Sequence, residues 1–176
     1  VYGVWGVLVV VPFISIYLAP AFGKTSAGYS ILAGAVVLAI MSIPYILNML
    51  IGVFQQIPVE LKEASLTLGA TEWETIRFVL LKEGLPGIIA AFGLGISKAL
   101  GETIAVLMVV GNVVQVPHNL FDAGYPLPAL IANNYGDMMS IPLYDSALML
   151  SALLLFVIIL IFNLFARILL HQYDTR

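Results

Sequence analysis

Four apolar stretches, each long enough to cross a bilayer as a helix, constrain this chain more than any other feature. A hydrocarbon core of about 30 Å needs roughly 20 apolar residues in helical conformation. The stretches are Val1–Phe22, Gly28–Val53, Leu85–Val110 and Ser146–Leu170. The chain is 61% hydrophobic and 10% charged, whereas soluble domains are about 45–50% apolar and 25% charged. The sequence therefore predicts an all-α, polytopic transmembrane helical bundle with about four spans in one domain, residues 1–176.

The basic residues between the stretches set the expected orientation in the membrane. Residues 112–145 contain no Lys or Arg. Five of the seven basic residues lie between the second and third stretches or at the end of the chain: Lys62, Arg77, Lys82, Arg167 and Arg176. Cytoplasmic loops carry an excess of Lys and Arg. We therefore expect residues 54–84 and the C-terminus to face the cytoplasm. Lys24, in a short outer loop, is the exception.

Segment 58–84 carries the signals of two short helices joined by a sharp turn. Pro58 suits a first helical position, and Gly69 can adopt the left-handed conformation that ends a helix. Thr71 and Glu74 have the spacing of a capping box at the start of a second helix. Both predicted helices combine charges with an apolar stripe, which favours docking in a partner's groove. The alternative is a solvated loop that packs back onto the chain's own membrane helices.

The third stretch contains two charged residues, Lys98 and Glu102, near its middle. Each charge costs about 2.5–3.5 kcal/mol at the centre of a membrane helix, so we expect both to face protein or water. A row of small residues at spacing four, Gly93, Ser97, Gly101 and Ala105, lies beside them and is typical of close helix packing. Two interpretations stay open for the pair: an ion pair that ties helices together, or part of a transport pathway.

The remaining polar residues favour structural roles. Residues 112–145 are rich in proline and include a short apolar piece, 127–132, for which we expect a short helix at the outer face. A metal site is not expected, because the candidate ligands are irregularly spaced and suit a solvated face; they are His118, Asp122, Asp137 and Asp145. Asn48 and Asn163 lie singly within spans and suggest hydrogen bonds between helices.

Two motifs resemble a known transporter family. Glu63-Ala64-Ser65, Gly69 and then Val79-Leu80-Leu81 have the spacing of the EAA loop of ABC-importer permeases. The stretch Lys98–Val106, KALGETIAV, followed by Gly111-Asn112, is similar to the signature of PstC-type permeases of phosphate importers. Ser65 stands where that family has a second Ala, and Lys98 where it has Arg. The resemblance covers nearly the whole chain.

The resemblance implies a MetI-like permease fold in the cell inner membrane, with a multi-pass topology and further spans upstream of this C-terminal portion. It implies that the coupling helices are 58–84, that Glu63, Ala64 and Gly69 couple to the ATPase, and that Lys98 and Glu102 line the substrate path. The implied partners are a second homologous permease, two cytoplasmic ATPase subunits, an external phosphate-binding protein, phosphate and membrane lipid, and not nucleic acid.

On this interpretation the chain is not an enzyme and holds no cofactor, because ATP is bound by the partner ATPase subunits. Two alternatives stay open within membrane transport. One is a permease of the same superfamily for another oxyanion, such as molybdate or sulfate. The other is a secondary transporter that uses Glu102 as a proton carrier, although a carrier without an ATPase needs no docking helices.

Overall fold

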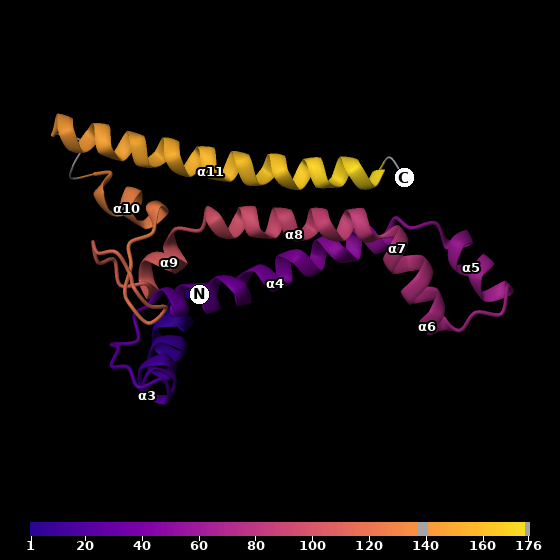
Figure 1. Cartoon of the computed structure of the whole chain (residues 1–176), viewed down its shortest axis with the longest axis horizontal. Coiled ribbons are helices and arrows are strands. Elements are labelled where there is room, and N and C mark those ends of the chain that lie inside the picture. Colours follow the sequence, from indigo (N-terminus) through magenta and orange to yellow (C-terminus); the bar gives the residue numbers. More distant parts are fainter. Residues whose placement is uncertain (137–140, 175–176) are drawn as a thin grey trace. The chain divides into compact units, whose positions relative to one another are not determined.

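The computed structural model of the chain describes residues 1–136 and 141–174, whose regular structure is helical apart from an isolated backbone bridge between Gly111 and Gly124 (Figure 1). The all-α prediction is therefore confirmed for this part of the chain. The elements are α1 (Tyr2–Trp5), π-helix η1 (Gly6–Val10), α2 (Val11–Phe13), π-helix η2 (Ile14–Leu18), α3 (Ala19–Ala21), α4 (Ile31–Gln55), α5 (Val59–Thr67), α6 (Glu72–Thr75), π-helix η3 (Ile76–Leu80), α7 (Leu81–Glu83), α8 (Leu85–Leu100), α9 (Ile104–Val109), α10 (Leu127–Asn134) and α11 (Pro142–Asp174).

Three of the predicted spans are present as helices of sufficient length and hydropathy. They are Tyr2–Ala21, Ile31–Gln55 and Pro142–Phe165. A fourth candidate is a bent pair, Glu72–Glu83 with Leu85–Leu100, whose axes differ by 64°. The described residues thus contain three to four spans, which makes the chain a multi-pass membrane protein. The short helix expected around 127–132 is also confirmed, as α10.

The third predicted span is shorter than expected. A continuous helix over Leu85–Val110 is wrong, because α8 ends at Leu100 and α9 begins only at Ile104. Gly101 N–H donates to the Lys98 carbonyl at 3.1 Å and Glu102 N–H to Ala99 at 3.2 Å, so the last turn tightens to an i→i+3 pattern. Glycine is the poorest helix former after proline, which explains why the helix stops at this position.

The first span is one helix that contains two π-helical segments. The π-helical segments η1 and η2 end two residues before Pro12 and Pro20 respectively. Proline lacks the N–H that an α-helix needs at this point. A local π-helical turn absorbs the missing bond, and the chain continues as a helix through both prolines.

The described chain divides into two compact units. The first unit comprises Val1–Ser42 and Lys98–Leu160. Its core joins the first span, α4 and α9 through buried residues such as Ile14, Val37 and Val109. The N-terminus of α4 is closed by the outer segment, since the backbone N–H groups of Ile31 and Leu32 donate to carbonyls of that segment at 3.1 and 2.9 Å. The outer segment is therefore tied to the spans.

The second unit comprises Ile43–Ser97 and Ile161–Arg176. Helices α4 and α8 pack closely within it because small residues of α8 face α4. A Cβ atom on Gly95 would lie 2.5 Å from Ile46 Cγ1, and one on Gly87 would lie 2.7 Å from Val53 Cγ2. Gly87 and Gly95, with buried Ala91 between them, form a small-residue row at spacing four.

This row replaces the predicted one. Of the predicted residues Gly93, Ser97, Gly101 and Ala105, the last two lie beyond the end of α8. Ser97 instead donates its hydroxyl to Asn163 Oδ1 of α11 at 2.7 Å. The expected role of Asn163 as a hydrogen-bonding partner between helices is thus confirmed. Asn48 is exposed on α4.

Candidate functional site

The segment 58–84 folds as two helices side by side, as the sequence predicts (Figure 1). The first helix is α5, and α6, η3 and α7 form the second, Glu72–Glu83. Gly69 between them has φ +90°, the left-handed conformation expected of it. Its N–H donates to the Leu66 carbonyl at 3.0 Å, which closes the end of α5. One detail differs: Pro58 precedes α5 as its N-cap, with an extended ψ of 133°.

A complete capping box begins the second helix. The Thr71 hydroxyl accepts from the Glu74 backbone N–H at 3.3 Å, and the Glu74 carboxylate accepts from the Thr71 backbone N–H at 2.8 Å. The Thr71 backbone N–H, and then its hydroxyl, lower the pKa of Glu74 below the usual value. The turn between the helices therefore has defined backbone geometry on both sides.

A side-chain hydrogen bond links the two helices. Ser65 Oγ of α5 lies 3.0 Å from Thr75 Oγ1 of α6. Thr75 is only 1% exposed, and no other side chain from Pro58 to Glu83 is buried. Sequence reasoning noted Ser65 only as a departure from the family pattern and did not identify Thr75. A Thr four residues after the N-cap Thr71 gives no signal of a contact ten residues away.

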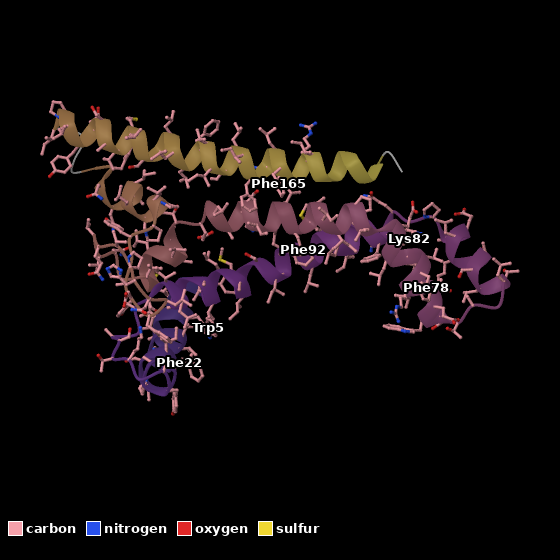
Figure 2. The ribbon with its side chains drawn as sticks, in the orientation of Figure 1. Trp5, Phe22, Phe78, Lys82, Phe92 and Phe165 are labelled. Carbon is pink, nitrogen blue, oxygen red and sulfur yellow. The ribbon has the colours of Figure 1, made fainter. Side chains whose placement is uncertain are left out.

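The outward surface of the helix pair carries large apolar side chains among its charged ones. Leu68 at the turn is 89% exposed and Trp73 is 68% exposed. Phe78 lies further along the second helix, where the Arg77 guanidinium lies 5.5 Å from its ring centroid, and Lys82 follows (Figure 2). A solvated helix pair normally turns such residues inward. This surface therefore has the character of an interface.

The three predicted coupling residues occupy different positions in this pair. Glu63 and Ala64 are both exposed on α5, and the backbone carbonyl of Glu63 accepts the Thr67 hydroxyl at 2.7 Å. Gly69 is at the turn, and a Cβ atom there would meet no atom within 4 Å. Its requirement for glycine is thus conformational and does not come from packing.

Gly84 connects the helix pair to α8. It adopts a right-handed conformation, with φ −74° and ψ −9°, so it does not end the helix by a left-handed turn. The axes of Glu72–Glu83 and Leu85–Leu100 differ by 64° across it. A Cβ atom at Gly84 would lie 3.1 Å from the Phe54 ring at the end of α4. The helix pair is therefore joined to two membrane helices of its own unit at one small residue.

Lys98 and Glu102 both lie at the break in the third span. Lys98 is exposed on the last turn of α8, whereas Glu102 is partly buried in the non-helical residues that follow. The two residues therefore do not share one continuous helix, because α8 ends between them. Thr103 next to Glu102 donates its hydroxyl to the Gly101 carbonyl at 3.4 Å.

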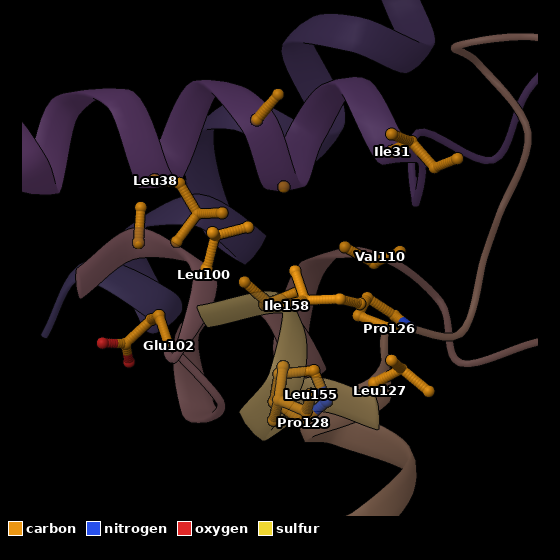
Figure 3. Close-up of a pocket in the computed structure, with 14 residues that line it drawn as sticks. Ile31, Leu38, Leu100, Glu102, Val110, Pro126, Leu127, Pro128, Leu155 and Ile158 are labelled. Carbon is orange, nitrogen blue, oxygen red and sulfur yellow. The ribbon is translucent and has the colours of Figure 1, made fainter. Parts of the chain in front are cut away.

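Glu102 also lines an apolar pocket of about 350 Å³ in the first unit. The lining comes from α4, α8, α9, α10 and α11, and includes Leu38, Leu100, Val110 and Pro126 (Figure 3). Figure 3 shows the Glu102 carboxylate at one end of the pocket, turned away from the apolar residues. The charge thus lies at the mouth of the pocket, next to the helix break.

Of the residues considered as metal ligands, Asp145 lies in the first turn of α11, whereas Asp122 stabilises the loop before α10. Asp122 accepts from the backbone N–H groups of His118 and Asn119, both at 2.9 Å. These bonds, with a smaller contribution from Lys24, hold the pKa of Asp122 below its usual value. Lys24 in turn donates to the Asn119 side chain. Asp137 lies outside the described residues, as does the C-terminal Arg176.

Known proteins resemble this chain over most of its length. It is 35% identical over 190 residues to the phosphate transport system permease protein PstC of Xylella fastidiosa, covering 100% of this chain and 58% of that protein. It is 34% identical to PstC of Haemophilus influenzae, covering 98% of this chain and 58% of that protein. It is 37% identical to the probable ABC transporter permease protein YqgH of Bacillus subtilis, covering 95% of this chain and 52% of that protein.

The chain thus spans somewhat more than half the length of these relatives, which are transport permeases by name. No solved structure matches it significantly. The sequence profile of a membrane transport family matches residues 3–176, almost the whole chain. The chain therefore belongs to the family of binding-protein-dependent transport system inner membrane components.

Proposed function

We propose that this chain is part of a permease subunit in an ATP-driven importer that moves inorganic phosphate. Membership of the binding-protein-dependent family supports transport, and the PstC names of the relatives support phosphate. The permease itself supplies the membrane path. Two cytoplasmic ATPase subunits supply the energy, a second homologous permease completes the path, and an external binding protein delivers the anion.

The observation that carries this proposal is the exposure of large apolar side chains on the 58–84 helix pair. The pair buries the hydroxyl of Thr75 and exposes Leu68 and Trp73. Burying a large apolar side chain is worth about 1.5–3 kcal/mol, so a partner gains substantially by covering these two residues. Trp is also among the residues that most often dominate binding at interfaces. The segment is therefore the docking element for the ATPase, with Glu63, Ala64 and Gly69 in the coupling role.

The basic residues of the 58–84 helix pair support an orientation of the chain in the membrane. Lys62, Arg77 and Lys82 lie in or beside the helix pair, and Arg and Lys accumulate on the cytoplasmic side. An ATPase that uses cytoplasmic ATP must also meet its docking element there. We place residues 54–84 and the C-terminus in the cytoplasm and the 112–124 segment outside, where its exposed residues, such as Val114, face the binding protein.

The break at Gly101–Thr103 is the proposed lining of the substrate path. Non-helical backbone at membrane depth is tolerated only where it is covered by protein or lines a water-filled cavity. Glu102 lies within this break and Lys98 lies on the helical turn before it, so two charges meet the break. Lys98 offers phosphate a point charge without the bidentate geometry of an Arg. Glu102 competes with the anion for cationic partners, so binding stays weak enough for release.

Reconstitution tests the proposal. The full-length permease, its partner permease, the ATPase and the binding protein are placed in vesicles, and phosphate uptake is measured with and without ATP. We expect uptake that requires ATP, that Lys98→Ala strongly reduces and that Lys98→Arg largely retains. Uptake of molybdate or sulfate in place of phosphate would contradict the substrate assignment. Uptake driven by a proton gradient without ATP would contradict the ATP-driven mechanism.

A further inference from the structure

The hydrogen bond between Ser65 and Thr75 is the main contact between the two helices of the 58–84 segment. The two hydroxyls lie 3.0 Å apart across the turn, one on each helix. Thr75 is 1% exposed, whereas every neighbour from Thr71 to Phe78 is exposed. The contact between the helices is thus centred on one polar bond and lacks an apolar core of its own.

Other elements fix the turn but leave the angle between the helices open. The left-handed Gly69 and the bond from the Ala70 N–H to the Ser65 carbonyl, at 3.3 Å, end α5. The capping box of Thr71 and Glu74 begins the second helix. Both are local backbone features. A bond between side chains ten residues apart is needed to hold one helix against the other.

We propose that the Ser65–Thr75 hydrogen bond locks α5 and the Glu72–Glu83 helix into one rigid body, which makes both residues positioning residues for coupling to the ATPase. The inference rests on the proposed docking function. An ATPase that moves Leu68 and Trp73 at the turn then moves the far end of the second helix by the same rotation. That end leads through Gly84 to α8 and to the end of α4.

Loss of the bond lets the angle between α5 and the Glu72–Glu83 helix vary, but it does not remove the docking surface. Leu68 and Trp73 do not depend on either hydroxyl for their exposure, because Thr75 lies on the inner side of the pair. A pair whose angle varies still binds the ATPase and still allows ATP hydrolysis. Movement of the ATPase then partly changes the angle between the two helices and is not fully transmitted to α8, so less transport accompanies each ATP hydrolysed.

The test measures phosphate taken up per ATP hydrolysed in vesicles that contain the complete transporter. Removing a hydrogen bond of this kind changes a conformational equilibrium by about fivefold. We expect Ser65→Ala and Thr75→Val each to lower the ratio by about that factor while ATPase pull-down stays at the level of the unsubstituted protein. Thr75→Ser keeps the hydroxyl and should keep the ratio.

Thr67→Ala is the matched control. Thr67 also lies on α5, but its hydroxyl bonds to the Glu63 carbonyl of the same helix. The ratio should therefore be unchanged in this variant. Ser65→Ala combined with Thr75→Val should be no worse than either single variant, because both remove the same bond.

Three outcomes overturn the lock: an unchanged ratio in Ser65→Ala, an unchanged ratio in Thr75→Val, or effects that add in the double variant. Failure of the docking proposal looks different, because it concerns ATPase association. Trp73→Ala should weaken pull-down of the ATPase. Undiminished pull-down in that variant would contradict docking at this surface, whatever the ratio in the Ser65 and Thr75 variants.

Discussion

Substitution of Gly69 separates the conformational role of this residue from any contact it could make. Its φ of +90° lies in the region that side chains with a Cβ atom rarely adopt, and no atom lies within 4 Å of a Cβ placed there. An L-residue pays about 1–2 kcal/mol in a left-handed conformation. Replacing glycine also restricts the unfolded chain, which offsets about 0.4–1 kcal/mol of this. Gly69→Ala should therefore weaken the turn by about 1 kcal/mol.

Two further substitutions of Gly69 should destabilise the turn to different extents. Asn tolerates the left-handed region better than Ala, so Gly69→Asn should be milder. Gly69→Pro fixes φ near −65° and removes the N–H that donates to the Leu66 carbonyl, so it should cost about 3 kcal/mol or more. Gly52→Ala serves as the control, because Gly52 lies in α4 without neighbours near its Cβ position.

The assay is pull-down of the ATPase by the full-length permease over a range of ATPase concentrations. If docking needs the native turn, apparent affinity should fall in the order Gly, Asn, Ala, Pro, with about fivefold between glycine and alanine for a cost of about 1 kcal/mol. Affinity that is equal for Ala and Asn, or that is lost equally in Gly52→Ala, would refute the conformational explanation.

Three other predictions follow from contacts in the structure. Gly87→Ala should destabilise the permease by about 1–3 kcal/mol through overlap with Val53, seen as a lower Tm, whereas Gly52→Ala should not lower it. Ser97→Ala should lower the free energy of unfolding by about 0.6 kcal/mol, seen as a slightly lower Tm, because Asn163 loses its hydrogen bond. Because the pKa of Glu74 is lowered, its ionised form stabilises the segment fully at pH values above the ordinary pKa of 4.5, and this stabilisation is lost as the pH falls through the lowered pKa. Hydrogen-exchange protection of the segment should therefore decrease at low pH, and Glu74→Gln should abolish this pH dependence.

The spans and the helix pair could be predicted because their signals are local. Hydrophobic length alone identifies three of the spans, and the structure extends or trims these by a few residues. Gly69, Thr71 and Glu74 each act on the backbone within four residues of their own position. Such features need no knowledge of the rest of the fold, so the sequence predicts them correctly.

The helix break and the packing row could not be predicted in the same way. Apolar residues continue on both sides of Lys98 and Glu102, so the sequence favours one long helix where the structure has two. Helical spacing alone also allows two rows of small residues in α8, offset by two positions. Which row packs depends on where Ile46 and Val53 of α4 lie, and this is a property of the folded unit.

Cross-linking at the turn tests the central claim most directly. The 176 residues contain no cysteine, so a single cysteine can be placed at will in a full-length permease freed of cysteines elsewhere. Leu68→Cys lies at the exposed turn, and Val114→Cys, also exposed, lies in the 112–124 segment. We predict that Leu68→Cys cross-links to the cytoplasmic ATPase and that Val114→Cys does not. Cross-linking of the ATPase to Val114→Cys, or labelling of Leu68→Cys only from outside the cell, would contradict the account.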